Sequence, residues 1–549
     1  MPTKKGNSIS ANDASSTARL SRVVASSSLA VFIIVSVVLT AIADNAYMRK
    51  LDDLNIFMSG SAYFSECMSV PCGLLNWVGS FLTQFFYYPW AGSLLLTAVL
   101  TALWFVVVRS FGIPRRLFAL GAVPSVLCLL FLLSIGYVVF MVKGMGFPFL
   151  MPLGFMVSAA YYGIYVRIGK AWLRAVAVAA GVLAGYPLFG VFALFGAALC
   201  VVGELLRFRS YWPAAVALAA IICWPYGYFY LADNHMTMER LYISGLPYYS
   251  GYGPHIERLT AVIFVSMAVM PFIFRRRDCG SRKPMAAIIA GGAVFVASIL
   301  ALVLLRYSDE NFRVTLAMDK AIEEERYDDA RRHYIGLEGE PTRAIVLLNH
   351  IALMHQGTAG DSLFAHKTAA AEYNVPDKNF PSMRMAAARP VYYHFGRIYD
   401  AYRWGMEDMV EFGPRITYLK YMTKVALLSG ETELAKRYLD KISRTLFYKD
   451  WAEKYRAYAD KPELLEADAE FSRLAPLRAY ISYIGGDSGL IESYLTSNLV
   501  SLNGGPDELL ELSLQFNMVQ KNIDGFWPRL QRYASTHKRL PRHYQEAII

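Results

Sequence analysis

The 549-residue sequence is poor in charged residues and lacks the common signatures of soluble enzymes. Only 18% of its residues are Asp, Glu, Lys or Arg, whereas soluble globular chains contain about 25%. It has no GxxxxGK(S/T) phosphate loop, no HExxH and no GxSxG, so nothing indicates P-loop, zinc-peptidase or α/β-hydrolase chemistry. Because 55% of the residues are hydrophobic, a purely cytosolic enzyme is excluded.

Cysteine is also scarce, with six residues and none after position 279. No Cys/His arrangement has the spacing of metal ligands. Cys67 and Cys72 lie close together after the first apolar run. In an oxidising compartment they are candidates for a short-loop disulfide, although chance proximity accounts for the pair nearly as well.

Basic residues are unevenly distributed. Residues 1–306 contain 23 Lys and Arg against 10 Asp and Glu, whereas residues 307–549 contain 31 against 34. The net charge of +10 therefore comes from the apolar half, where cytoplasmic loops of membrane proteins collect Lys and Arg. We expect no nucleic-acid partner.

The first membrane span is predicted at residues 23–43, which contain no charge. Twenty-one helical residues are enough to cross a hydrocarbon core of about 30 Å. Ala41-Ile42-Ala43 also resembles a signal-peptide cleavage site. The preceding 22 residues, predicted as a disordered cytoplasmic tail, and the length of the apolar run favour an uncleaved anchor.

A transmembrane helix bundle of about nine spans is predicted over residues 23–306, with one long outer loop at 44–88. With nine spans and a cytoplasmic N-terminus, 17 of the 23 basic residues lie on the cytoplasmic side, as expected for short loops. This count requires a tight hairpin near Gly185-Tyr186-Pro187, and it places residues 307–549 in the periplasm of a Gram-negative bacterium. The predicted spans are 23–43, 89–108, 117–142, 145–166, 171–186, 188–206, 214–231, 259–274 and 285–305.

Residues 307–549 are predicted to form a soluble helical repeat domain, which makes the whole chain all-α. Apolar residues recur there at spacings of three and four, as in amphipathic helices. Residues 327–334 and 431–439 follow predicted helices at 311–325 and 416–430. Each resembles the second helix of a tetratricopeptide (TPR) unit, in which a small residue, here Ala330 or Ala435, packs against the neighbouring helix.

The rest of this domain is predicted as further helices at 343–356, 389–403 and 508–532, the last broken near 521–524. The acidic run Glu323-Glu324-Glu325 is interpreted as a solvated helix face. The aromatic clusters at 392–395 and 526–528 are interpreted as packing between helices. Stacked helix pairs form concave surfaces, so binding of envelope proteins is the default use of such a domain.

Several stretches resemble an uncharacterised family of bacterial polytopic membrane proteins. They are residues 81–90 (FLTQFFYYPW), 185–190 (GYPLFG), 245–247 (GLP), 402–408 (YRWGMED), 445–453 (TLFYKDWAE) and 543–547 (HYQEA). The resemblance covers nearly the whole chain from the first span onward. It implies an inner-membrane protein with a helical-repeat tail, and it supplies no catalytic residues.

The layout also resembles membrane glycosyltransferases of the GT-C type, in which a first span leads into an outer loop with an early acidic residue. Such a transferase needs a carboxylate as general base or as a ligand for a divalent metal; Asp44, Asp52 and Asp53 are the candidates. Lys143, His235 and Arg240, on outer connections, are candidates for binding the phosphate of a polyprenyl-linked sugar.

Each of these residues also has a structural interpretation. Asp44 ends the first helix in the headgroup region, Asp52 and Asp53 cap a helix, and the basic residues are ordinary interfacial charges. Three hypotheses follow: a GT-C-like transferase, a non-enzymatic scaffold that recruits envelope proteins through residues 307–549, and a lipid or solute carrier.

Overall fold

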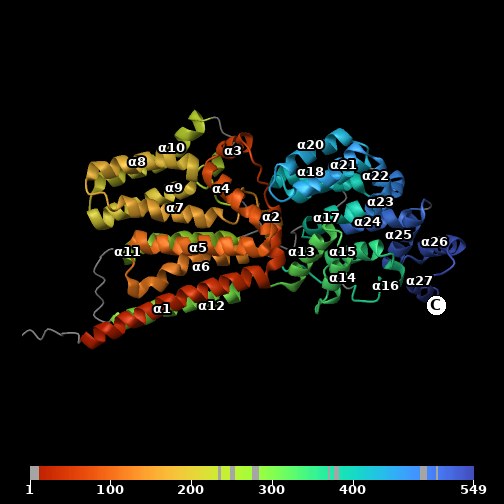
Figure 1. The fold of residues 1–549 in the computed structure, drawn as a ribbon, viewed down its shortest axis with the longest axis horizontal. Helices are drawn as coiled ribbons and strands as arrows, with labels where there is room; N and C mark the ends of the chain where they lie inside the picture. The colour runs from red at the N-terminus through yellow and green to blue at the C-terminus, as the bar shows by residue number, and fades with distance from the viewer. Residues whose placement is uncertain are drawn as a thin grey trace, which may run out of the picture. The chain divides into compact units, whose positions relative to one another are not determined.

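The computed structural model describes residues 11–232, 236–247, 254–274, 284–368, 371–375, 382–481, 491–502 and 505–549 (Figure 1). Within these ranges every regular element is a helix, which confirms the all-α prediction. The chain divides into two compact units. Unit 1 comprises residues 1–52, 60–135 and 144–307, and unit 2 comprises residues 53–59, 136–143 and 308–549.

Unit 1 contains the long apolar helices. Its elements are α1 (Ala11–Val37), η1 (Val38–Ala43), α2 (Asn45–Asp53, whose last residue belongs to unit 2), α3 (Ser61–Met68), α4 (Gly73–Thr83), η2 (Gln84–Tyr87), α5 (Pro89–Phe111), η3 (Arg115–Ala122), α6 (Val123–Leu133), α7 (Leu150–Tyr165), α8 (Ala171–Phe189), α9 (Val191–Gly203), η5 (Glu204–Phe208), α10 (Tyr211–Leu231), η6 (Met238–Arg240), α11 (Pro254–Ile273) and α12 (Pro284–Leu305).

Eight helical segments among the described residues are long and apolar enough to cross a membrane, so the chain is a multi-pass membrane protein. They correspond to eight of the nine predicted spans. The ninth, α7, is apolar but only 16 residues long, because Gly144 and Gly146 have positive φ and delay the start of the helix. Residues 11–22, predicted as disordered, are part of α1.

Two predicted spans have different boundaries in the structure. The segment expected at 117–142 is interrupted, because α6 ends at Leu133 and Gly136 has φ +56°. The predicted hairpin is confirmed, but its turn lies at Gly190, with φ +57°, rather than at Pro187. Pro187 lies in the last turns of α8, and Gly190 supplies the conformation that reverses the chain.

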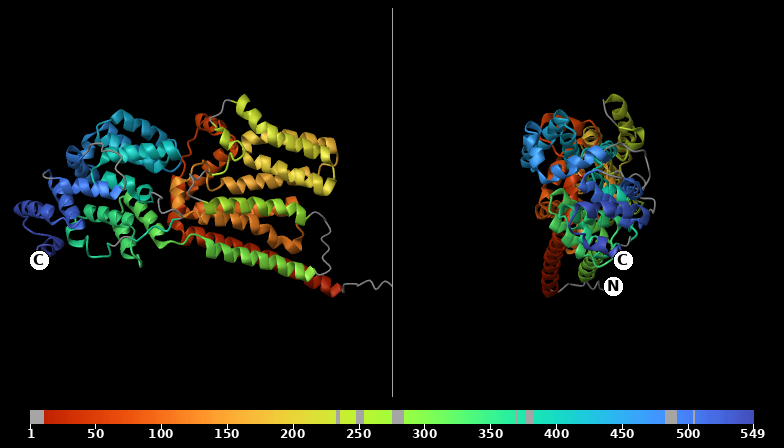
Figure 2. Two further views of the ribbon diagram at one scale, coloured as in Figure 1. Left: turned by 180° about the vertical axis from the view of Figure 1, so that it is seen from behind. Right: turned by 90° about the vertical axis from the view of Figure 1, so that its right-hand side faces the viewer.

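Small and hydroxylated residues mediate contact between the helices of unit 1, which run side by side in both views (Figures 1 and 2). The Ser158 hydroxyl on α7 donates to the carbonyl of Phe192 on α9 at 2.6 Å. Between α1 and α5, the hydroxyls of Ser36 and Thr97 lie 2.8 Å apart. This is the packing expected of helices in lipid, where small side chains permit close approach.

Unit 2 is built from shorter helices. Its elements are η4 (Gly136–Met141), α13 (Glu310–Glu323), α14 (Tyr327–Ile335), α15 (Arg343–His355), α16 (Ala359–Ser362), α17 (Ser382–His394), α18 (Ile398–Phe412), α19 (Ile416–Leu428), α20 (Thr432–Ser443), α21 (Lys449–Asp460), α22 (Glu463–Ala467), α23 (Ala469–Ile481), α24 (Ile491–Ser501), α25 (Asp507–Val519), α26 (Ile523–Thr536) and α27 (Arg542–Glu546).

Helices that follow one another in sequence pack as pairs in unit 2: α13 with α14, α17 with α18, α19 with α20, and α25 with α26. Ala330 and Ala435 are fully buried at the predicted helix contacts. The prediction of one continuous helix at 389–403 is wrong. The chain breaks there between α17 and α18, since Gly396 has φ +82° and terminates α17.

Candidate functional site

Helix α19 is the most unusual element of unit 2 in its burial. All 13 of its residues are buried, although a helix on the surface of a soluble domain has a polar face. Two of the buried residues are Lys420 and Lys424, each 6% exposed and one helical turn apart. Buried ammonium groups require charged partners, and both lysines have them.

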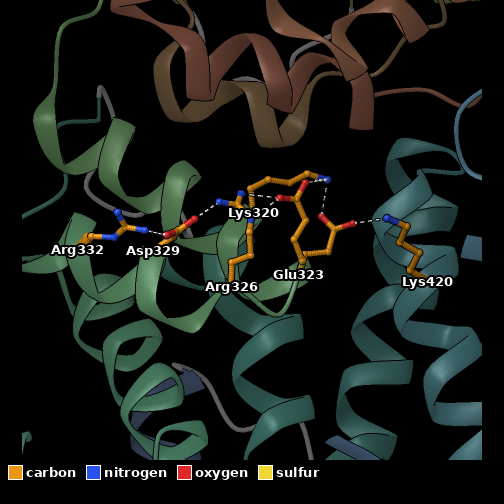
Figure 3. Close-up of polar contacts among 7 residues, drawn as sticks. Lys320, Glu323, Arg326, Asp329, Arg332 and Lys420 are labelled. Atoms are coloured by element: carbon orange, nitrogen blue, oxygen red, sulfur yellow. Dashed lines mark hydrogen bonds and ion pairs between the residues drawn. The ribbon is translucent and has the colours of Figure 1, made fainter. Parts of the chain in front are cut away.

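Lys420 pairs with Glu323 at the end of α13, with Nζ 2.7 Å from Oε1. Lys320 contacts the other Glu323 oxygen at 3.1 Å, so the carboxylate lies between two ammonium groups (Figure 3). Burial alone would raise the pKa of Glu323. The two lysines lower it by more than burial raises it, so the pKa of Glu323 lies well below its usual range. Glu323 is therefore a permanent anion, and the interpretation of this acidic run as a solvated face is wrong for it.

The remaining charges drawn in Figure 3 are more exposed than Glu323. Arg326 pairs with Glu324 at 2.5 Å and with Asp329, which also binds Arg332. The Arg332 side chain is 78% exposed. Exposed pairs of this kind contribute little to stability, so the chain of charges from Glu324 to Arg332 is a solvated helix face.

Lys424 is the second buried cation on α19. Its Nζ lies 2.9 Å from both carboxylate oxygens of Glu470 on α23, and the hydroxyl of Tyr393 donates to the same carboxylate at 2.5 Å. Burial lowers the pKa of Lys424, but Glu470 raises it more, so the pKa lies well above its usual value. Lys424 therefore stays protonated near neutral pH and cannot act as a general base. We call Glu323, Lys420, Lys424 and Glu470 the α19 network.

Asp53, a predicted catalytic residue, caps α19. Its Oδ1 accepts a hydrogen bond of 2.8 Å from the backbone N–H of Thr417, in the first turn. The N-cap residue of α19, Arg415, makes no side-chain cap of its own, so Asp53 supplies the missing acceptor. Arg415 in turn donates to the carbonyl of Val142 at 3.1 Å. Segments 53–59 and 136–143 thus hold the N-terminus of α19.

The other two predicted carboxylates are also inside the protein. Asp44 is 5% exposed, and its Oδ2 lies 2.8 Å from Nη1 of Arg306, which follows α12. This pair joins the end of the first span to the end of the last within unit 1. Asp52 is 7% exposed at the end of α2.

The predicted phosphate-binding residues that the structure describes belong to different units. Lys143 belongs to unit 2, where it pairs with Glu411 at 2.5 Å and lies over the ring of Phe412. Arg240 lies in η6 of unit 1. His235 lies outside the described residues.

Cys67 and Cys72 are both buried free thiols, so the predicted disulfide is absent from the structure. The sulfur of Cys67 lies 3.7 Å from that of Met145. Burial raises the pKa of Cys67 to about 11, so its thiol remains protonated and unreactive.

Two buried histidines, His350 and His394, and the half-buried His355 lie on the neighbouring helices α15 and α17 of unit 2. His355 Nε2 and His394 Nδ1 are 3.0 Å apart, and the ring of Tyr327 stacks on His355 at 4.1 Å. His350 Nε2 lies 2.6 Å from the side-chain oxygen of Gln515. Burial lowers the pKa of His350 to about 4 and that of His355 to about 3, so these rings are neutral at physiological pH.

A pocket of about 590 Å³ opens near the end of unit 2 between α25, α26 and α27. Its walls include Ile523 and Trp527, which are 68% and 41% exposed. The one histidine in its lining, His543, uses both ring nitrogens: Nε2 accepts from the backbone N–H of Phe364 at 3.2 Å, and Nδ1 lies 2.9 Å from Glu546. Most of the other lining residues are apolar, as in ligand-binding clefts.

Sequence reasoning missed the α19 network. A signal was present, because residues 416–428 are largely apolar yet contain two lysines four positions apart. Such a pattern requires two carboxylates from other helices, but it does not identify them. Within the part of the chain that the structure describes, no three His, Cys, Asp or Glu side chains are grouped as metal ligands.

Comparison with known proteins places the chain in a family but gives no activity. Neither the curated proteins nor the solved structures yield a significant match. Residues 20–549 match the family of unknown function DUF6057, nearly the whole chain, as the resemblance in sequence indicated. The protein is therefore a member of the DUF6057 family, with apolar spanning helices in unit 1 and a helical unit organised around α19.

Proposed function

We propose that this protein is a membrane-anchored scaffold of the bacterial cell envelope. Unit 1 holds the protein in the inner membrane, and the TPR-like helix pairs of unit 2 bind a partner protein. The distribution of Lys and Arg supports a cytoplasmic N-terminus and a periplasmic C-terminal half. Paired helices stacked in sequence order support the TPR-like assignment.

The observation that carries this proposal is the apolar pocket between α25, α26 and α27. Ile523 and Trp527 are exposed on unit 2 and line the same pocket. Exposed apolar side chains that are grouped in this way occur mainly at binding sites. Its lining combines these side chains with Lys521 and Glu546 at the edge. An apolar segment of another protein, with polar groups beside it, fits this chemistry.

The contacts of the predicted carboxylates favour the scaffold over a GT-C-like transferase. A general base must reach the proton that it removes, but Asp44 is paired with Arg306 and Asp53 caps α19. In these contacts neither Asp44 nor Asp53 is placed to act as the base of a transferase.

Photocrosslinking in native membranes tests the scaffold. A photoreactive amino acid replaces Ile523 in the full chain, and the matched control carries it at Ile335, which is 53% exposed on α14 and outside the pocket. We expect a discrete protein adduct from position 523 alone, and its loss when Trp527→Glu is added. Absence of any adduct specific to position 523 would contradict the proposal.

Two further measurements separate the alternatives. Asp44→Asn and the Asp52→Asn/Asp53→Asn double variant are compared for lipid-linked sugars and glycoproteins; loss of a glycan at unchanged protein level would replace the scaffold by the transferase. A periplasm-active phosphatase fused after Ser308 is expected to be active. Fluorescence from a cytoplasmic reporter at that position would instead place unit 2 in the cytoplasm.

A further inference from the structure

A groove of about 380 Å³ lies on unit 1 between α5 and α7. Its apolar wall is formed by Phe105, Val106, Ala160 and Ile164. Phe105 is 48% exposed and Ile164 is 62% exposed, although both lie on apolar helices. In a multi-pass membrane protein such side chains face hydrocarbon, so the wall of the groove is suited to an acyl chain.

The floor of the groove depends on a close approach of the two helices. A Cβ atom added at Gly163 would lie 2.5 Å from the hydroxyl oxygen of Ser110 and 2.9 Å from its Cα. A larger residue at position 163 would therefore push α7 away from α5. The glycine therefore permits the close approach of α5 and α7 beside the groove.

Two guanidinium groups lie at one end of this groove. Arg109 is in the last turn of α5, and Arg167 directly follows the end of α7. Both are exposed, and neither has an ion-pair partner among the residues that the structure describes. The groove lining contains no carboxylate. The end of the groove at Arg109 and Arg167 therefore has a local charge of +2, which is complementary to an anion.

The turn that carries Arg167 is held by a buried ion pair. Arg174, 4% exposed, pairs with Glu204, which is fully buried. The hydroxyl of Tyr165 also donates to Glu204 at 2.8 Å. Nη1 of Arg174 donates to the carbonyl of Gly169 at 2.8 Å. The backbone beside Arg167 is therefore fixed, and less conformational freedom is lost when Arg167 binds a ligand.

We propose that this groove binds an anionic phospholipid. One acyl chain lies along Phe105, Val106 and Ile164, and the phosphate lies between Arg109 and Arg167. Arginine suits this role because its planar group makes paired hydrogen bonds to phosphate oxygens. Basic residues between spanning helices at a membrane surface recognise such headgroups. The assignment depends only on unit 1 and is independent of any protein partner of unit 2.

Native mass spectrometry of the full-length protein in detergent tests the proposal. Phosphatidylglycerol is titrated against phosphatidylcholine with the same acyl chains. We expect at least tenfold tighter binding of phosphatidylglycerol, and at least a tenfold loss of that affinity in Arg109→Gln/Arg167→Gln. The matched control, Arg115→Gln/Arg116→Gln, removes the same charge from η3 outside the groove and should change affinity less than twofold.

A second variant tests the apolar wall without changing charge. Ala160→Trp fills the groove and should also reduce phosphatidylglycerol binding tenfold. If the Arg109→Gln/Arg167→Gln variant does not fold, this variant alone decides the question. Equal binding of the two lipids, equal loss in the matched control, unchanged binding in Ala160→Trp, or full competition by millimolar inorganic phosphate would each overturn the proposal.

Discussion

The two units bury charge in different places. In unit 2 two buried cations, Lys420 and Lys424, lie in the middle of α19, a helix with no exposed residue. In unit 1 the buried pairs Asp44–Arg306 and Arg174–Glu204 lie at helix ends. A charge at the centre of a bilayer costs far more than one near its surface. A helical unit surrounded by water can instead use central ion pairs to fix which helices meet.

The largest effect is expected from breaking the core of unit 2 with Glu470→Leu. Lys424 would lose the carboxylate that it contacts at 2.9 Å, and a buried unpaired charge costs about 3 to 5 kcal/mol. Thermal unfolding of the detergent-solubilised protein measures this loss. The Glu470→Leu/Lys424→Met double variant should recover most of it. A double variant as unstable as the single one would show that the ion pair is not the cause.

Acidification should destabilise unit 2 through His350 and His355. The pKa of His350 falls from 6.5 to about 4 and that of His355 to about 3, so the unfolded chain binds more protons than the folded one. Stability should therefore decrease as pH falls from about 6.5 towards 4, by on the order of 3 kcal/mol for His350. Melting temperatures between pH 7.5 and 4.5 measure this. His350→Asn should flatten the profile, whereas His366→Asn, at an exposed position, should leave it unchanged.

A smaller effect is expected in unit 1 from Glu204→Gln. The amide still accepts a hydrogen bond, and Arg174 keeps its contacts with the carbonyls of Ile168 and Gly169. We expect a loss of about 1.5 to 3 kcal/mol, the value of a hydrogen bond to a charged group. Resistance to protease in detergent micelles reports it. A loss equal to that of Glu470→Leu would remove the distinction between core and helix-end charges.

Removal of the cap that Asp53 provides for α19 should reduce the stability of unit 2 by less than Glu204→Gln reduces that of unit 1. Asp53→Ala deletes the acceptor for the Thr417 N–H and should destabilise unit 2 by about 0.5 to 2 kcal/mol. Asp53→Asn keeps an acceptor oxygen and should be close to wild type, since Asn is also a good N-cap residue. Chemical denaturation of both variants tests this. Equal destabilisation by Ala and Asn would indicate that the charge, not the cap, is important.

The smallest effect is expected on the exposed charges of α14. Arg332→Ala removes a contact with Asp329 from a side chain that is 78% exposed, and surface pairs contribute little. The melting temperature should stay within experimental error. A clear decrease would show that these charges act as one network with Lys320 and Glu323 rather than as a solvated face.

Periodicity and composition predicted the all-α class and eight of the spanning helices, because an uncharged apolar run of about 20 residues matches the thickness of a bilayer. They failed where one glycine decides a boundary, as at Gly190 and Gly396. They also failed for Glu323, whose partner Lys420 is 97 residues away. For Asp53 the capping alternative is confirmed, but the sequence did not identify the capped helix, which begins 364 residues later. Local patterns identify a carboxylate but not the helix that it meets.

Segment 53–59 has a consequence for the order of events during synthesis. Asp53 leaves the ribosome 364 residues before Thr417, which corresponds to about 20 to 70 s at 5–20 residues per second. Most apolar helices of unit 1 are made during this interval. Unit 2 can therefore be completed only after the membrane helices have been synthesised, and a fragment that starts at residue 308 lacks the acceptor that begins α19. Such a fragment should refold less completely than one supplied with a peptide of residues 53–59.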